Sequence, residues 1–290
     1  MRKLLIPSLG LAAAAVLALA ATATAARTAP AAIPGCAVGS LNLVEDGTFT
    51  VGADNPAFPP WWGGAAKKPW QVSNPASGQG YESAVAYAVA KELGFTKAQV
   101  KWTVVPFNNS FRPGKKPFDV YITQVSYTPE RAKAADFSRS YYFVNQAVVG
   151  RKGKPIAKVK SIAGLKPFKL GAQVGTTSYT YITKYIKPSS KPLVYDTNDA
   201  AVQALKNGQI DGIVVDLPTA FYVTAVQVSD GVIVGKLPTR GTKEHFGMVL
   251  QKGNTLTRCV DKALDRLWLN GTIKKLQTTY LARAGAPDIK

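Results

Sequence analysis

The sequence is poor in the side chains from which most metal centres and active sites are built. It has one histidine, His245, and two cysteines, Cys36 and Cys259, far apart in a chain of 290 residues. A zinc site needs several His or Cys ligands at short spacing. The chain also lacks G-x-S-x-G, Walker A and H-E-x-x-H patterns. We therefore expect no metal site, no cofactor and no catalytic activity.

Acidic residues are scarce as well. The chain has 17 Asp and Glu against 36 Lys and Arg, a formal charge of +19. Such an excess is compatible with nucleic acid, anionic lipid or anionic wall polymer as a neighbour. The basic residues are spread thinly, often in pairs such as Lys67-Lys68 and Lys115-Lys116, with no Arg-rich block or RNP-like motif. We therefore expect no nucleic-acid binding and keep wall polymer as an alternative.

The chain has only one long apolar run, Leu4 to Ala20. Arg2 and Lys3 precede it, and a small-x-small cleavage site, Ala23 to Ala25, follows. This pattern is typical of a secretory signal peptide, here residues 1–25. Residues 26–37, rich in Ala and Pro, are expected to form a flexible leader. Since no second apolar run approaches membrane-spanning length, the mature chain is predicted to be exported and either soluble or merely anchored.

In an exported chain, an even number of cysteines indicates a disulfide, here Cys36–Cys259. Closing so long a loop stabilises a fold by about 4–5 kcal/mol in the chain-entropy model. The stretch from Ile33 to Cys36 also crudely resembles a lipid-attachment motif, although Pro34 fits it poorly and the apolar run lies far upstream. The disulfide is favoured and lipidation of Cys36 is the alternative.

Helix and strand patterns alternate along the chain, which indicates α/β architecture with mostly parallel sheets. Helices are expected over 80–95, 176–186, 197–208 and 257–281, the last broken at Asn270-Gly271. Strands are expected over 48–54, 100–107, 118–123, 170–175, 193–196 and 210–216.

Two stretches share one plan, "KKPFDVYITQVS" and "KNGQIDGIVVDLP". Each has a basic turn, an Asp, an apolar strand and polar residues at its carboxyl end. Ligands of open α/β sheets bind outside the carboxyl ends of strands. Thr123, Gln124 and Ser126 in one unit, and Asp216 in the other, are therefore candidate binding residues. Two such units suggest two lobes that face a shared cleft.

Arg131 stands one turn into a helix that Thr128 and Pro129 open. A cation there opposes the helix dipole, so it is either a solvated side chain or half of a clamp for a carboxylate, together with Ser126. In "VGTTSY", Gly175, Thr176 and Thr177 provide a second anion cradle or an ordinary helix cap.

Further candidates complete a set suited to a zwitterion. Asp216 is either a cap for the following turn or a partner for an ammonium group. Asp54, Phe58 and Phe107 provide a carboxylate and aromatic walls, unless the rings fill a core. Together with the carboxylate clamp, these groups are what a zwitterionic α-amino acid requires. Asp54 and Glu82 favour a polar or basic side chain on that amino acid, unless these carboxylates are structural.

On these residues the chain resembles the family 3 extracellular solute-binding proteins of ABC importers, which capture polar amino acids. The resemblance covers Leu41 to Leu281 and is most specific in "FDVYITQVSYTPERAKAADFSRSYY". "VGADNPAFPPW", "GYESAVAYAVAKELG", "LGAQVGTTSY" and "GQIDGIVVDLP" follow in the family's order. It implies a monomeric periplasmic or cell-envelope receptor that delivers an amino acid to a permease.

The same resemblance implies a two-lobe fold and a role for each residue. Lobe 1 would comprise 38–146 and 243–290, lobe 2 would comprise 147–242, and hinge strands would lie near 145–150 and 237–246. Both cysteines would then fall in one lobe. Arg131, Ser126 and Thr177 would hold the α-carboxylate. Asp216 would take the α-ammonium with Thr123 or Gln124, while Phe58, Phe107 and Asp54 would meet the ligand's side chain.

Two alternatives come from other classes. Dehydratase-like enzymes share this scaffold, and turnover of a bound substrate would identify one. A surface protein held on anionic wall polymer would instead show salt-sensitive binding that does not depend on Arg131 or Asp216.

Overall fold

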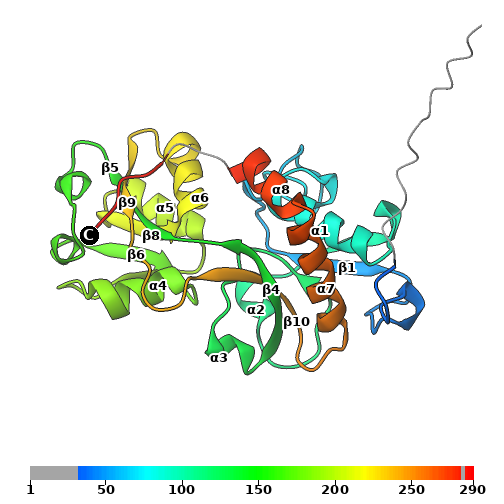
Figure 1. Ribbon diagram of the computed structural model, residues 1–290. Helices are drawn as coiled ribbons and strands as arrows, with labels where there is room; N and C mark the ends of the chain where they lie inside the picture. The colour runs from blue at the N-terminus through cyan, green and yellow to red at the C-terminus, as the bar shows by residue number, and fades with distance from the viewer. Residues whose placement is uncertain (1–31, 282–284) are drawn as a thin grey trace, which may run out of the picture. The chain divides into compact units, whose positions relative to one another are not determined.

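The structure is a computed structural model that describes residues 32–281 and 285–290. It contains two five-stranded sheets, each flanked by helices (Figure 1). We call the part built on the first sheet the first lobe and the part built on the second sheet the second lobe. The predicted signal peptide, residues 1–25, lies outside the described residues. No helix of the described part combines the length and apolarity that crossing a bilayer requires.

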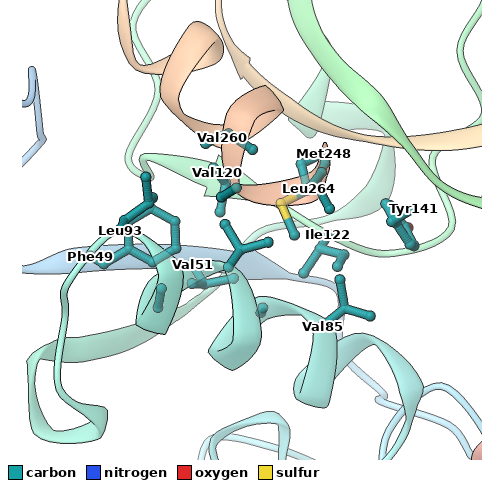
Figure 2. Close-up of a cluster of buried hydrophobic side chains, with 14 of the residues drawn as sticks. Phe49, Val51, Val85, Leu93, Val120, Ile122, Tyr141, Met248, Val260 and Leu264 are labelled. Carbon is teal, nitrogen blue, oxygen red and sulfur yellow. The ribbon is translucent and has the colours of Figure 1, made fainter. Parts of the chain in front are cut away.

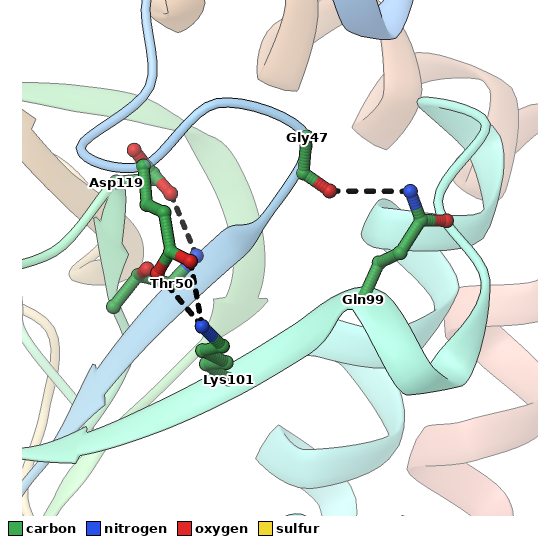
Figure 3. Close-up of polar contacts among 6 residues, drawn as sticks. Gly47, Thr50, Gln99, Lys101 and Asp119 are labelled. Atoms are coloured by element: carbon green, nitrogen blue, oxygen red, sulfur yellow. Dashed lines mark hydrogen bonds and ion pairs between the residues drawn. The ribbon is translucent and has the colours of Figure 1, made fainter.

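The first sheet has the order β2-β1-β3-β10-β4. β1 pairs in parallel with β2 and β3, whereas β10 runs antiparallel to β3 and β4. Polar contacts fix the entry to β1: Asp119 accepts the N–H groups of Val44 and Thr50 at 2.7 and 2.6 Å, and Gln99 donates to the Gly47 carbonyl (Figure 3). The five strands are Phe49–Ala53 (β1), Val100–Val104 (β2), Val120–Tyr121 (β3), Ala135–Phe143 (β4) and His245–Gln251 (β10).

Three helices, α1, α7 and α8, contact one another beside this sheet. The apolar face of α1 places Val85 and Val89 against Phe49 and Val51 of β1, and α7 adds Leu264 to the same buried cluster (Figure 2). Burying such a side chain stabilises the fold by about 1.5–3 kcal/mol. The helices of this lobe are Tyr81–Glu92 (α1), Phe107–Ser110 (α2), Pro129–Ala132 (α3), Leu256–Leu269 (α7) and Thr272–Leu281 (α8), with 3₁₀ turns at Val38–Ser40, Pro75–Ser77 and Lys97–Gln99.

The second sheet repeats this plan in the order β7-β6-β8-β5-β9. β6 pairs in parallel with β7 and β8, and β5 runs antiparallel to β8 and β9. Its strands are Gln146–Arg151 (β5), Leu170–Gln173 (β6), Leu193–Tyr195 (β7), Gly212–Asp216 (β8) and Gly231–Lys236 (β9). Its helices are Thr177–Tyr181 (α4), Asn198–Lys206 (α5) and Leu217–Tyr222 (α6); α4 and α6 continue as π-helical turns, Ile182–Ile186 and Val223–Gln227, and 3₁₀ turns occupy Pro155–Lys158 and Ala163–Leu165.

The expected elements are present, and the α/β two-lobe class is confirmed. The sheets are mixed because β10 and β5 run against their neighbours, which the sequence pattern did not show. The chain passes between the sheets at 144–145 and at 237–244. These links overlap the predicted hinge segments, whose bending stays a prediction, as do the lobe boundaries.

Two stretches lie elsewhere than expected. The C-terminal residues, assigned to lobe 1, pair with β9 instead: Ile289 donates its N–H to the Lys236 carbonyl and is buried in the second lobe. Within the predicted flexible leader, Ile33 and Cys36 are buried in the core of the first lobe. The leader prediction is thus wrong for residues 32–37.

The disulfide accounts for that packing. Cys36 is bonded to Cys259 of α7, so the predicted pairing is confirmed. Since its thiol is in the disulfide, Cys36 is not free for a lipid. The bond attaches the start of the described chain to a helix of the core.

Candidate functional site

A cavity of about 300 Å³ lies between residues of the two lobes. The carboxyl ends of β1, β3, β6 and β8 contribute to its wall, where open α/β sheets bind ligands. All ten predicted ligand residues line it; their roles in binding stay predictions. They are Asp54, Phe58, Phe107, Thr123, Gln124, Ser126, Arg131, Thr176, Thr177 and Asp216.

Arg131 is held rigidly although it sits on the short helix α3. Thr128 caps this helix by accepting the Arg131 N–H, and Pro129 occupies its first turn, as predicted. The guanidinium donates to the carbonyl of Ser126 at 2.5 Å and, across the cavity, to the carbonyl of Gly175 at 2.7 Å. No acceptor among the described residues meets its other three N–H groups. Arg131 is only 9% exposed, so it is not a solvated side chain.

Aromatic rings surround the same guanidinium. Its carbon lies 4.5 Å from the ring centre of Phe111 and 5.6 Å from that of Phe107, within cation–π distance. Burial lowers the pKa of Arg131 to about 10, while the charges of Glu244 and Asp216 act against that shift. At neutral pH the side chain is therefore a desolvated cation with unused donors, which suits a carboxylate.

Asp216 faces the cavity from the end of β8. It makes no side-chain cap for α6; instead its Oδ1 accepts from Gln146 Nε2 at 2.7 Å. The structural alternative for this residue, a helix cap, is thus wrong. Burial raises the pKa of Asp216 well above its usual range, and the nearby charge of Glu244 raises it further. A cationic group bound beside Asp216 would offset this repulsion.

The role of Ser126 and Thr177 involves Glu244, which the sequence did not single out. Both hydroxyls donate to Glu244 Oε1, at 2.6 and 2.5 Å. Gln146 Nε2 also contacts the Glu244 carboxylate, at 3.1 Å. Glu244 lies in the 237–244 link, far in sequence from every motif, so only the folded chain brings it to the site.

Thr176 is the N-cap of α4, where it accepts the Tyr179 N–H. The second of the two predictions for Thr176, an ordinary helix cap, is therefore confirmed. Gly175, just before it, has φ +75°, and a Cβ there would overlap Asn108 Oδ1. This close approach explains why glycine stands at that position. Asn108 Oδ1 is buried and has no hydrogen-bond partner among the described residues, and Asn108 is one of the residues that line the cavity.

The aromatic loop after β1 serves the core and the cavity together. Trp61 and Trp62 are buried in the first lobe, and Trp61 Nε1 donates to Thr219 of α6 at 3.1 Å. Phe58 lines the cavity, with its ring centre 5.8 Å from that of Tyr222. Asp54 lies beside it, and burial raises its pKa. The loop thus contributes an aromatic side chain and one carboxylate to the wall of the cavity.

Glu82 does not line the cavity but supports Gln124, which does. The Glu82 carboxylate accepts the Gln124 backbone N–H at 2.6 Å, the Gln124 side-chain amide, and the Tyr141 hydroxyl at 2.5 Å. Gln124 has φ +44°, a conformation that costs a non-glycine residue free energy. The bonds from Glu82 hold this strained backbone, so Glu82 acts on the cavity only through Gln124.

Replacing Glu82 by glutamine is expected to remove a pH dependence of stability. Burial raises its pKa from 4.5 to about 7, so between these values the folded chain holds a proton that the unfolded chain has released. The resulting stabilisation is present at low pH and is lost as the pH rises through about 7, by about 2–3 kcal/mol.

Urea unfolding at about pH 5 and pH 8 measures this effect. Between these pH values the wild type should lose more free energy of unfolding than Glu82→Gln. The exposed Glu130→Gln variant, with the same change of charge, should behave as the wild type. Equal pH slopes for wild type and Glu82→Gln would refute the assignment.

The cavity is acidic although the chain is basic. Four aspartates and one arginine line it, namely Asp54, Asp196, Asp199, Asp216 and Arg131. No cluster of three or more His, Cys, Asp or Glu suited to a metal ion occurs in the described part of the chain. The acidic lining favours a ligand that carries positive charge beyond one ammonium group.

The two-lobe α/β fold with a polar cavity between the lobes defines a class of small-solute receptors. A model of the bacterial extracellular solute-binding proteins, family 3, matches residues 63–283. The chain belongs to this family. Relatives of the chain are named as amino-acid-binding proteins, and the names of two of them state that they belong to ABC transporters.

Several relatives carry names that state a ligand. The chain is similar to the L-arginine-binding protein of Pseudomonas aeruginosa, 26% identical over 75% of this chain and 85% of the relative. It is also similar to the L-cystine-binding protein TcyJ of Escherichia coli, 27% identical over 83% of this chain and 86% of the relative.

Solved structures agree with this assignment. An ancestral arginine-binding protein bound to glutamine is 29% identical, with a TM-score of 0.66 over 82% of this chain and 100% of that one. The ancestral amino acid-binding protein AncCDT-1, described as a precursor of cyclohexadienyl dehydratase, is 28% identical, with a TM-score of 0.66 over 81% and 96% of the two chains.

Proposed function

We propose that this protein binds a free cationic α-amino acid in the cavity between its lobes and delivers it to an ABC permease from outside the cytoplasmic membrane. The acidic lining around a buried arginine carries the proposal. The unused donors of Arg131 suit the α-carboxylate, and Asp216 suits the α-ammonium. Asp54, Asp196, Asp199 and the unpaired oxygen of Asn108 then remain for a cationic side chain.

Both lobes contribute to each end of such a ligand. Arg131 belongs to the first lobe and already donates to Gly175 of the second. Asp216 belongs to the second lobe, whereas Asp54 and Thr123 belong to the first. A ligand that contacts both sides favours the conformation in which the lobes approach each other. That conformation is the form a permease would recognise.

A thermal-shift screen tests the ligand class. Residues 26–290 are refolded free of ligand and mixed with cationic (arginine, lysine, ornithine, histidine), neutral (glutamine, cystine) and acidic (glutamate, aspartate) amino acids. At 100 times its dissociation constant, a ligand adds about 2.7 kcal/mol of stability. We expect the largest rise with a cationic amino acid. A largest rise with glutamate or aspartate, or no rise at all, would contradict the proposal.

The enzyme alternative has one observation in its favour, namely the similarity to a dehydratase precursor. A dehydratase would need a proton donor and acceptor next to its substrate. The cavity offers aspartates, but no histidine, lysine or glutamate from residues 32–281 or 285–290 lines it. Binding without turnover is therefore the better supported function.

A further inference from the structure

Glu244 bonds to groups from both lobes although it does not itself line the cavity. It accepts from Ser126 in the first lobe and from Thr177 and Gln146 in the second, at 2.5 to 3.1 Å for the shortest contact with each. Ser126 and Gln146 are 2% and 3% exposed. Thr177 and Glu244 are themselves partly exposed. The contacts are therefore shielded from water on the side of Ser126 and Gln146, and hydrogen bonds to an ionised carboxylate are among the stronger ones.

These bonds fix the direction in which each partner can bond. A hydroxyl has one proton and two acceptor lone pairs. Because Ser126 and Thr177 donate their protons to Glu244, they present only lone pairs to the cavity. The Gln146 amide is fixed as well, since its Nε2 donates to Glu244 and Asp216 while its oxygen accepts from Ser178 at 2.6 Å. Around Asp216, this cluster therefore offers acceptors to a ligand and no hydroxyl donors.

We infer that Glu244 is a positioning residue that makes this side of the cavity selective for the α-ammonium group of the ligand. It does so by orienting the hydroxyls of Ser126 and Thr177 and the amide that holds Asp216. The inference rests on the proposed amino-acid binding, and it reverses the predicted role of the two hydroxyls. They accept from the ammonium, whereas Arg131 alone among the charged lining groups holds the carboxylate.

Glutamine at position 244 inverts this arrangement. Its amide has one oxygen and one NH₂ group, whereas the Glu244 carboxylate accepts on both oxygens: the two hydroxyls donate to Oε1, and Gln146 Nε2 donates to Oε2. With the amide oxygen at the Oε1 position, the NH₂ faces Gln146 Nε2, donor against donor, and the amide that holds Asp216 must turn. With the NH₂ at that position, both hydroxyls must accept, and their protons turn to other acceptors. In either orientation the ammonium loses a partner, while Arg131, which holds the carboxylate, keeps its donors.

The test compares the cationic amino acid that gives the largest rise in the thermal-shift screen with the same molecule without its α-ammonium group; for L-arginine, taken as the example below, this is 5-guanidinopentanoate. Calorimetric titration gives both dissociation constants for wild type, Glu244→Gln and Glu130→Gln. We expect Glu244→Gln to weaken arginine binding about tenfold, as for one hydrogen bond to a charged group. Binding of 5-guanidinopentanoate should stay within about twofold of the wild type. Glu130→Gln, an exposed change of the same charge, should leave both unchanged.

Each other outcome points to a different failure. If Glu244→Gln weakens the binding of both compounds equally, Glu244 only connects the two lobes, and the inference is overturned. Unchanged binding of both compounds would overturn it as well. If the wild type binds neither compound, the proposed function fails instead. Should Glu244→Gln not fold, judged by circular dichroism, Thr177→Val replaces it. Removing that hydroxyl should also weaken arginine more than its analogue, and equal weakening would overturn the inference.

Discussion

Arg131→Ala should leave the chain folded and remove amino-acid binding. Among the residues that the structure describes, Arg131 is the only cation that lines the cavity, and it is nearly inaccessible to water. Without it, the ligand carboxylate would be buried with no counter-charge. Truncating one partner of such a pair costs about 2–5 kcal/mol, which corresponds to a loss of roughly 30-fold to several thousandfold in affinity.

Calorimetric titration with the ligand found in the screen measures this loss. The matched control is Arg139→Ala, which removes an arginine from β4 whose ion pair with Asp265 is largely exposed. Arg139→Ala should bind as the wild type does. Arg131→Lys keeps the charge but loses the forked donor geometry, so its affinity should lie between those of the wild type and Arg131→Ala. An affinity unchanged in Arg131→Ala would remove this residue from the site.

The second large effect concerns stability. Replacing Cys36 and Cys259 by serine should lower the free energy of unfolding by about 5 kcal/mol in the chain-entropy model, because the bond closes a very long loop. The two cysteines are 223 residues apart. Removing the bond also frees the segment that carries Ile33, which is buried in the core of the first lobe.

Urea unfolding of the wild type and the double variant gives the difference. Ile33→Ala is the control: it trims the packing of the same segment but keeps the covalent bond, and it should cost less than the double variant. Affinity for the ligand should not change, since neither Cys36 nor Cys259 lines the cavity. A difference in the free energy of unfolding below about 1 kcal/mol would show that the disulfide does not reduce the conformational entropy of the unfolded chain as the chain-entropy model assumes.

Local patterns predicted the elements whose signals lie within a few residues. The apolar stripe of α1 and the Asn270-Gly271 break between α7 and α8 are of this kind. The ten predicted ligand residues line the cavity, although their roles stay predictions; those predicted at strand ends, such as Thr123 and Asp216, lie there because the carboxyl ends of strands converge in an α/β sheet. What was missed depends on long-range pairing. The antiparallel strands β10 and β5 and the C-terminal pairing with β9 have no local signature.

Glu244 illustrates the same limit at the site. Nothing in "GTKEHFG" marks a binding residue, because the significance of its carboxylate comes from Ser126, 118 positions away, and Thr177, 67 positions away. Glu82 shows the same limit in another way: its charge was compatible with a ligand contact or with a structural role, and the sequence did not decide between them. Burial beneath Gln124 makes it a support instead. Residue type alone does not distinguish a cavity wall from the layer behind it.

The most direct test is a calorimetric titration of the refolded wild type with the cationic amino acid that gives the largest rise in the thermal-shift screen and with its α-carboxamide (L-argininamide in the case of L-arginine), whose α-carboxylate is blocked. We expect saturable binding of one amino acid per chain. The amide should bind more weakly by at least about 30-fold, because Arg131 then has no anion to hold. Equal binding of the two compounds, or no saturable binding of either, would contradict the claim that this cavity holds a cationic amino acid by its carboxylate.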